Sequence, residues 1–154
     1  MHIEQLAAAA NNKRRTSLGN AKEDNQARVK ILMDSIYEVS RSMEAFRDKR
    51  PTAGRARMAM AAILLLDYAK ADGMNTARGY EDIGQKVENG IPVKDPLVEQ
   101  DCLSIVTLIA TAFTAGSKDD HRGLIMAAIG GCFLFAKIYS FDLESEIYSQ
   151  LAKV

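Results

Sequence analysis

Two segments of this chain resemble one another, and this internal repeat constrains the fold more than any other feature of the sequence. Residues 31–87 and 98–154 are each 57 residues long and match at an offset of 67 residues. Four residues of the first segment recur in the second, where Asp34, Val39, Ala45 and Phe46 return as Asp101, Val106, Ala112 and Phe113. Repetition at one period indicates that a single helical unit was copied and packs against its copy.

The apolar residues of the first unit follow the period of an α-helix. Steps of three and four residues alternate along Val29, Leu32, Ile36, Val39, Met43 and Phe46. This spacing predicts a helix of about 20 residues whose apolar stripe faces a core or a partner helix. The equivalent segment of the second unit is apolar on nearly every side, so we expect it at the centre of the fold.

The other helix boundaries follow from helix-breaking and capping residues. Pro51 ends the first helix, and a second helix begins near Gly54 or Arg55 and ends before Gly73. A short helix that carries Ala77, Tyr80, Ile83 and Val87 is expected next, capped by Asn75 or Thr76, and a break follows at 88–96. Further helices are expected over 97–115, 122–139 and 142–153. A polar loop over 116–121 separates the first two of these, and Asp142 caps the last. The sequence therefore predicts an all-α fold, a helical bundle of about six helices built from two repeated helical units.

The N-terminal segment lacks this periodicity. Residues 1–26 are rich in turn-forming and charged residues, so we expect a flexible or partner-dependent arm. The single helical domain then covers residues 27–154. A hydrophobic content of 47% with 26% charged residues is typical of a soluble globular protein.

Two apolar runs, 103–113 and 123–136, raise the question of whether the chain spans a membrane. Each is shorter than the roughly 18–20 apolar residues that span a bilayer, so we expect a helical hairpin buried in a protein core. A small membrane-permeabilising hairpin is the alternative. The N-terminus lacks the charged start and apolar core of a secretory signal, so we expect a cytoplasmic protein.

The cysteines and histidines offer little chemistry. Cys102 and Cys132 are expected to be buried thiols, with a disulfide or a metal site as the alternatives. His121 lies beside Asp119 and Asp120 in a polar segment, where we expect a solvated loop because a metal site needs more ligands. The sequence contains neither a glycine-rich phosphate loop of Walker spacing nor a nucleophile-elbow pattern.

The ends of the two units share an order of structural elements that is typical of one enzyme family. Two segments share this pattern: residues 67–87, DYAKADGMNTARGYEDIGQKV, and residues 133–154, FLFAKIYSFDLESEIYSQLAKV. In each, a helix is followed by a Gly or short turn, a capping residue and a final helix that ends in Lys. This arrangement resembles the close of a MazG-type nucleotide pyrophosphohydrolase unit, and dimeric dUTPase-like members of that superfamily contain two such units. The resemblance implies Mg²⁺ held by Glu-x-x-Glu on one helix and Glu-x-x-Asp on the next, since carboxylate oxygens suit this cation.

The residues at the matching positions depart from that pattern. The first pair falls on Glu38-Val-Ser-Arg41, which retains one carboxylate, and the second on Arg57-Met-Ala-Met60, which retains none. The corresponding positions of the second unit, about 105–108 and 124–127, are apolar. We therefore expect a degenerate member without the metal site: not an enzyme, with no catalytic, metal-binding or cofactor-binding residues and no cofactor.

Basic residues are concentrated in the first part of the chain. Residues 1–57 carry 12 Lys and Arg against 7 Asp and Glu, although the whole chain has no net charge. The candidate partner-binding residues form two clusters: Lys13, Arg14 and Arg15, and Arg47, Lys49, Arg50, Arg55 and Arg57. An acidic surface of another protein is the expected partner, and nucleic acid is a weaker alternative because no aromatic residues are interleaved for base stacking.

These observations favour a non-catalytic helical protein that acts through protein–protein contacts and self-associates as a homodimer. Proteins of this kind are common in phages and mobile elements, where they act as inhibitors of host machinery. A nucleotide-binding or residual MazG-like NTP pyrophosphohydrolase is one alternative. A nucleic-acid binder that uses the basic clusters is the other.

Overall fold

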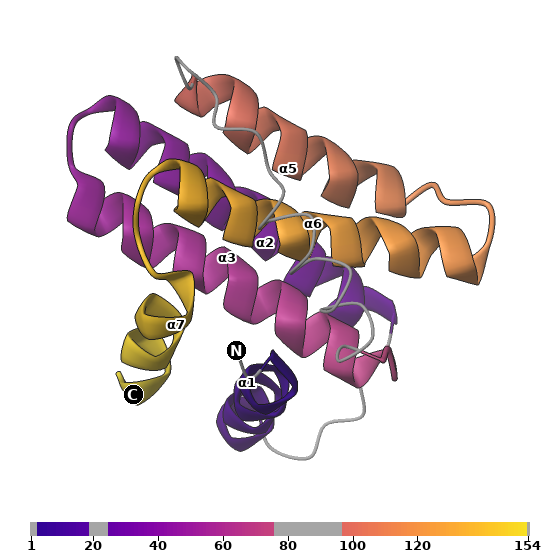
Figure 1. The fold of residues 1–154 in the computed structure, drawn as a ribbon. Helices are drawn as coiled ribbons and strands as arrows, with labels where there is room; N and C mark the ends of the chain where they lie inside the picture. The colour runs from indigo at the N-terminus through magenta and orange to yellow at the C-terminus, as the bar shows by residue number, and fades with distance from the viewer. Residues whose placement is uncertain (1–2, 19–24, 76–96, 154) are drawn as a thin grey trace.

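The protein is helical throughout the residues that its structure describes. The computed structural model describes residues 3–18, 25–75 and 97–153. Over these ranges it contains no strand and six helices, as Figure 1 shows: α1 (Ile3–Leu18), α2 (Asn25–Arg47), α3 (Pro51–Ala71), α5 (Val98–Ala112), α6 (Lys118–Ile138) and α7 (Leu143–Ala152). The prediction of an all-α helical bundle is confirmed. The short helix expected after Asn75 or Thr76 and the break at 88–96 lie outside the described residues.

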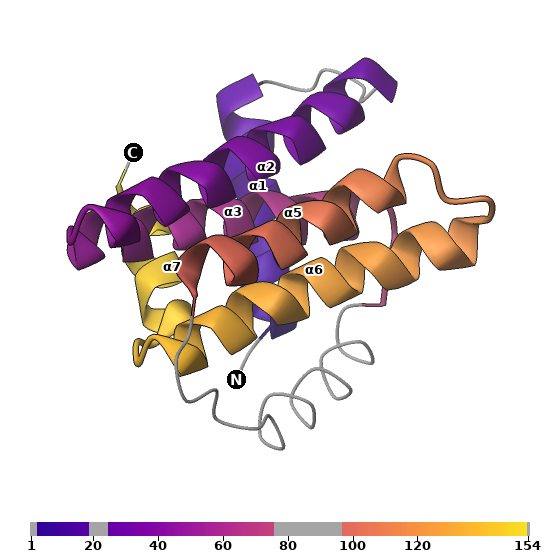
Figure 2. The ribbon, with the colours of Figure 1, turned by 90° about the horizontal axis from the view of Figure 1, so that it is seen from above.

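Four long helices form two helical hairpins that lie side by side. The α2–α3 pair and the α5–α6 pair run along the length of the molecule, while α1 crosses them and α7 returns beside α3 (Figures 1 and 2). Helix α3 packs against α1, α2, α6 and α7 and forms the centre of the core. Four of its alanines, Ala59, Ala61, Ala62 and Ala69, are completely buried, because small side chains allow several helices to approach one axis.

The prediction that the segment 97–115 lies at the centre is wrong. Helix α5 occupies this segment and packs on α2 and α6, with Leu103 62% exposed and Phe113, which follows its end, 40% exposed. Only Cys102, Ile105, Ile109 and Ala112 are buried. An apolar helix of few turns can sit at the edge of a bundle, because the packing of neighbours rather than composition decides which side is covered.

Two helix starts differ from the prediction because of local capping. Helix α3 begins at Pro51, whose fixed φ suits the first helical position, rather than near Gly54 or Arg55. Helix α6 begins at Lys118 rather than at 122, because the Ser117 hydroxyl accepts a hydrogen bond from the backbone N–H of Asp120 at 3.1 Å. The predicted cap of α7 is confirmed, since the Asp142 carboxylate accepts from the Ser145 N–H at 3.1 Å.

Helices α3 and α6 match each other at the offset of the sequence repeat. Each is 21 residues long, and they begin 67 residues apart. Two residues after its last residue, each helix is followed by a left-handed residue, Gly73 with φ +70° and Ser140 with φ +60°. The N–H groups of the next residues, Met74 and Phe141, each donate to the carbonyl five residues back at 3.0 and 2.9 Å. Duplication of one unit stays a prediction with which this correspondence agrees.

The N-terminal segment differs from the expected arm. Residues Ile3–Leu18 form α1, and Leu6, Ala7 and Ala10 are buried in the core against α3. The alanine-rich run supplies a narrow helix face that packs closely, although its few large apolar residues left no clear period in the sequence.

Both cysteines are free and buried, so the predicted thiols are confirmed. Among the described residues, α6 is the one helix long and apolar enough to cross a membrane, with a mean hydropathy of 1.3. The same length and composition are found in core helices of soluble proteins. Ile125, Ile129 and Cys132 of α6 are completely buried.

Candidate functional site

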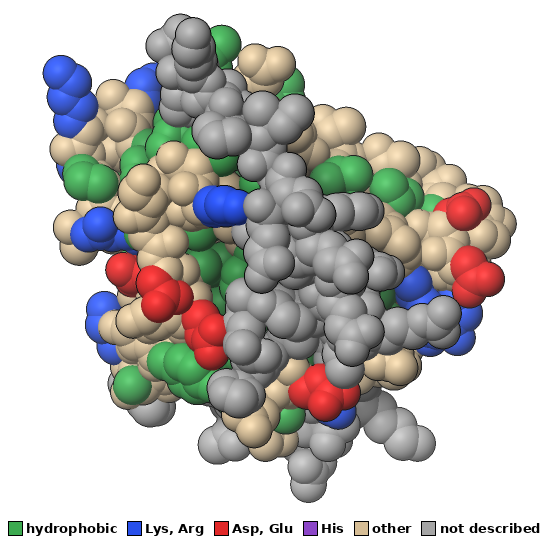
Figure 3. All heavy atoms as spheres, in the orientation of Figure 1, with side chains coloured by type: hydrophobic (Ala, Val, Ile, Leu, Met, Phe, Trp, Pro, Cys, Tyr) green, Lys and Arg blue, Asp and Glu red, His purple; other side chains and the backbone are tan. Residues whose placement is uncertain are grey.

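The basic cluster predicted over residues 47–57 divides into three parts: the turn residues, Arg55, and Arg57, which pairs with Glu38. Arg47, Lys49 and Arg50 are exposed at the turn between α2 and α3, where the two arginines lie 3.8 and 3.7 Å from Asp48. Arg55 extends toward α7 and lies 3.6 Å from Glu146. On the face drawn in Figure 3, Lys and Arg side chains are scattered rather than gathered into one patch.

Lys13, Arg14 and Arg15 belong to α1, and their side chains lie outside the described part of the structure. Of the candidate residues whose side chains are described, the structure brings together the three at the turn, Arg47, Lys49 and Arg50. Their role in partner binding stays a prediction.

Arg57 occupies one of the positions where the resemblance implies a metal ligand. Its guanidinium donates to both carboxylate oxygens of Glu38, at 3.1 and 3.3 Å. The carboxylate retained in the first acidic pair is thus neutralised by an arginine that stands in the second pair. Within the described ranges there is no group of three or more Asp, Glu, His or Cys side chains that could hold a metal ion. A guanidinium beside the one remaining carboxylate does not suit Mg²⁺, which needs several oxygen ligands.

The sequence prediction of a solvated loop around His121 is wrong. His121 lies in the first turn of α6 and is half-buried, because the Ser117 cap starts this helix earlier than expected. Its Nδ1 donates to the Ala112 carbonyl at 2.7 Å, since a carbonyl oxygen can only accept. In the neutral ring Nε2 then accepts from the Tyr68 hydroxyl at 2.6 Å. His121 therefore links α6 to the ends of α5 and α3.

Asp72, just after α3, joins α2 and α6. Its carboxylate pairs with Arg28 of α2, and it accepts from the Nε of Arg122 at 3.1 Å. A second Arg122 nitrogen donates to the Asp72 carbonyl at 2.8 Å. Burial raises the pKa of Asp72, but hydrogen bonds from the two guanidinium groups and their charges outweigh burial, so its pKa lies below the ordinary value of 3.8.

Arg28 also lies over the ring of Tyr68, with 5.3 Å from its central carbon to the ring centroid. Burial raises the pKa of the Tyr68 hydroxyl, and the Arg28 charge opposes this shift in part. The hydroxyl therefore stays protonated at neutral pH and available as a hydrogen-bond donor.

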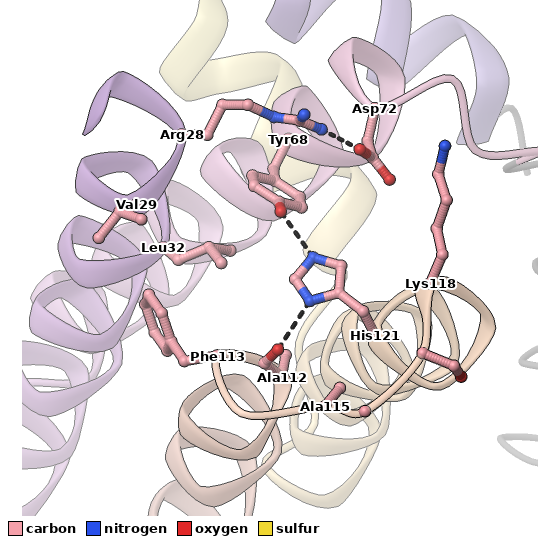
Figure 4. A pocket seen from close by; sticks show the side chains of 12 residues that line it. Arg28, Val29, Leu32, Tyr68, Asp72, Ala112, Phe113, Ala115, Lys118 and His121 are labelled. Atoms are coloured by element: carbon pink, nitrogen blue, oxygen red, sulfur yellow. Dashed lines mark hydrogen bonds and ion pairs between the residues drawn. The ribbon is translucent and has the colours of Figure 1, made fainter. Parts of the chain in front are cut away.

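These side chains surround a cavity of about 460 Å³ at one end of the bundle. It lies where α2 and α6 begin and where α3 and α5 end, and Figure 4 shows His121 between Tyr68 and Ala112. Val29, Leu32 and Phe113 form an apolar wall, while Arg28, Tyr68, Asp72, Lys118 and His121 supply polar groups. Sequence reasoning missed this cavity because its polar residues are distant in the chain, and each stands near a helix end.

A second surface stands out on α2. Val29, Met33 and Tyr37, four residues apart, are 42%, 60% and 54% exposed. Residues at this spacing share one face of a helix. The neighbouring positions carry opposite charges in pairs, Lys30 with Asp34 at 2.7 Å and Arg41 with Glu44 at 3.0 Å. In Figure 2, α2 forms one edge of the bundle.

Comparison of the chain with known protein families, with curated proteins and with solved structures finds no match.

Proposed function

We propose that this protein acts without catalysis, through protein–protein contacts, and that it forms a homodimer through the exposed face of α2. The observation that carries the proposal is the apolar stripe of Val29, Met33 and Tyr37 on the outer side of that helix. Three large apolar side chains aligned on one exposed helix face mark a contact surface more often than scattered single residues do.

The charges beside the stripe favour a second copy as the occupant. Along α2 they alternate in the order Lys30, Asp34, Arg41, Glu44. In an antiparallel pair with its two-fold axis beside Tyr37, Lys30 of one copy faces Glu44 of the other. Asp34 then faces Arg41. A parallel pair places like charges at equal heights, so the antiparallel arrangement is the complementary one.

The absence of catalysis is supported by the ion pair between Glu38 and Arg57. Where the MazG-like resemblance implies a divalent cation, the chain has a guanidinium 3.1 Å from the remaining carboxylate. An Mg²⁺-dependent assay over a panel of nucleoside triphosphates should give no hydrolysis. Hydrolysis that disappears in Glu38→Ala would refute the proposal of a non-enzyme.

Light scattering coupled to size exclusion tests the dimer. We expect a mass above the 16.9 kDa of the monomer at a protein concentration of about 100 μM, since a contact of one helix per copy is a small interface. Met33→Lys should shift the mass to the monomer. Leu103→Lys is the matched control, because Leu103 is equally exposed on α5 and lies outside the stripe. A wild-type monomer at this concentration would contradict the proposal.

A charge exchange tests the antiparallel register. Asp34→Arg and Arg41→Asp should each weaken the dimer, because each places like charges opposite one another. The double variant should restore it, because the two charges have then exchanged places across the axis. Circular dichroism checks that every variant remains helical. A double variant no better than the single ones would exclude this register.

A further inference from the structure

The cavity at the end of the bundle has two chemically different walls. One is apolar and consists of Val29, Leu32 and Phe113, and the other carries the groups of Arg28, Tyr68, Lys118 and His121. In Figure 4 the apolar side chains lie on one side of His121 and Lys118 lies on the other. A cavity of about 460 Å³ is within the range of about 300–1,000 Å³ that holds small ligands.

The charges of the described residues that line the cavity do not balance one another. Among the described lining residues, Arg28 and Lys118 are cationic and Asp72 is anionic. Asp72 pairs with Arg28 and also with Arg122, which lies behind the lining. Lys118 forms no ion pair with any residue of the described ranges. The described part of the lining therefore keeps one positive charge in excess. Asp119 and Asp120, the acidic residues next to Lys118, are not among these lining residues.

One donor of the polar wall is also unused. The Nε of Arg28 is buried and has no hydrogen-bond partner among the described residues. Buried donors are nearly always satisfied by protein, water or a ligand. This guanidinium lies over the Tyr68 ring and is held in place by Asp72, so it is already oriented before a ligand enters.

We propose that this cavity binds a small amphipathic monocarboxylate. Its carboxylate lies near the Lys118 ammonium and Arg28, and its apolar chain lies against Val29, Leu32 and Phe113. A single negative charge matches the one excess positive charge of the described lining residues. A phosphate monoester, which is mostly doubly charged at neutral pH, meets repulsion from Asp72.

Isothermal titration calorimetry with sodium octanoate tests the proposal on the whole protein. We expect one ligand per chain with a dissociation constant of about 1 mM or lower, a range open to ligands of this size. Octanol should bind at least about tenfold more weakly, because it lacks the charge that Lys118 and Arg28 recognise. Octyl phosphate, which tests the alternative head group, should also bind more weakly than octanoate.

Lys118→Gln supplies the site-specific readout. It should weaken octanoate binding about tenfold and leave octanol binding unchanged, because only the charged head contacts this residue. Lys137→Gln, at the other end of α6, is the matched control and should not alter binding. Thermal unfolding of both variants verifies that they are folded.

Three results would overturn the proposal. They are no octanoate binding by the folded protein, equal affinities for octanoate and octanol, or equal affinities of wild type and folded Lys118→Gln. Preference for octyl phosphate would show that the cavity takes a dianion and would also refute the monocarboxylate. Val29 belongs both to the cavity wall and to the α2 stripe, so the dimer is tested separately, by its mass in the absence of octanoate.

Discussion

At the scale of single residues, Asp72 has an unusual position. It follows the end of α3, yet its carboxylate and carbonyl bind arginines from α2 and α6. Removal of one partner from a partly buried ionic network leaves the others unsatisfied, which costs more than the loss of an exposed pair. A residue outside any helix therefore fixes how two hairpins meet.

We expect Asp72→Asn to lower the free energy of unfolding by about 2 kcal/mol at pH 7, because Arg28 and Arg122 lose a charged acceptor. The pKa of Asp72 is lowered in the fold, so its ionised form stabilises the protein fully above pH 3.8. This contribution is lost as the pH falls through the lowered pKa. Urea unfolding at a series of pH values should show the wild-type advantage disappear in that acidic range.

Asp48→Asn is the control for this prediction. Asp48 lies 3.8 and 3.7 Å from two exposed arginines, and such surface pairs contribute less than about 0.5 kcal/mol. If the two variants lose equal stability at pH 7, Asp72 is not the link that the geometry indicates.

At the scale of elements, the contact between α2 and α3 depends on a glycine. A Cβ built on Gly54 would lie 2.5 Å from the Phe46 ring. We expect Gly54→Ala to destabilise the protein by about 1–3 kcal/mol, because the ring is packed among Phe135, Tyr139 and Phe141 and has little room to move. Thermal and urea unfolding would measure the loss.

Gly123→Ala supplies the opposite case. Gly123 is an exposed residue of α6, and nothing lies within 4 Å of its added Cβ. The substitution should stabilise the protein by about 0.5–1 kcal/mol through helix propensity alone. Shifts of the same sign for the two glycines would contradict the close packing of Phe46 on Gly54.

The left-handed residues after α3 and α6 predict opposite changes in stability when glycine and serine are exchanged between them. Ser140 adopts φ +60° where α3 has Gly73 at φ +70°. Ser140→Gly should raise stability by about 0.5–1 kcal/mol, because a left-handed conformation costs a residue with a side chain more than glycine. Gly73→Ser should lower stability by a similar amount. The two unfolding midpoints, measured under one condition, check both signs.

The described helices after α1 could be predicted from the sequence, but α1 could not, and neither could the neighbours of each helix. Periodic apolar residues such as Leu32 and Val39 and the cap at Asp142 are local signals. The edge position of α5 depends on which helices cover it, and nothing in the sequence around Leu103 indicates that this side chain is exposed. The cavity was missed for the same reason, since Arg28, Tyr68 and His121 come together only through packing of separate helix ends.

At the scale of the whole molecule, α1 connects the N-terminal segment to the core. Leu6 is completely buried, and α1 packs against α3 and α7. If α1 belongs to the cooperative unit, loss of this side chain must affect global unfolding and not only the N-terminus.

We expect Leu6→Ala to lower the free energy of unfolding by about 2–4 kcal/mol, with one transition seen by all probes. Gln5→Ala, at an exposed neighbouring position, should have little effect. An unchanged midpoint for Leu6→Ala would restore the interpretation of residues 1–26 as an independent arm.

The reactivity of the two buried thiols can be used to measure local unfolding of the native protein. Burial raises the pKa of Cys102 and of Cys132 to about 12, so almost no reactive thiolate is present at pH 8. A thiol reagent can therefore modify them only while the α5–α6 hairpin is transiently open. The rate of modification in native buffer then measures how often the α5–α6 hairpin opens, without any label or substitution in the chain.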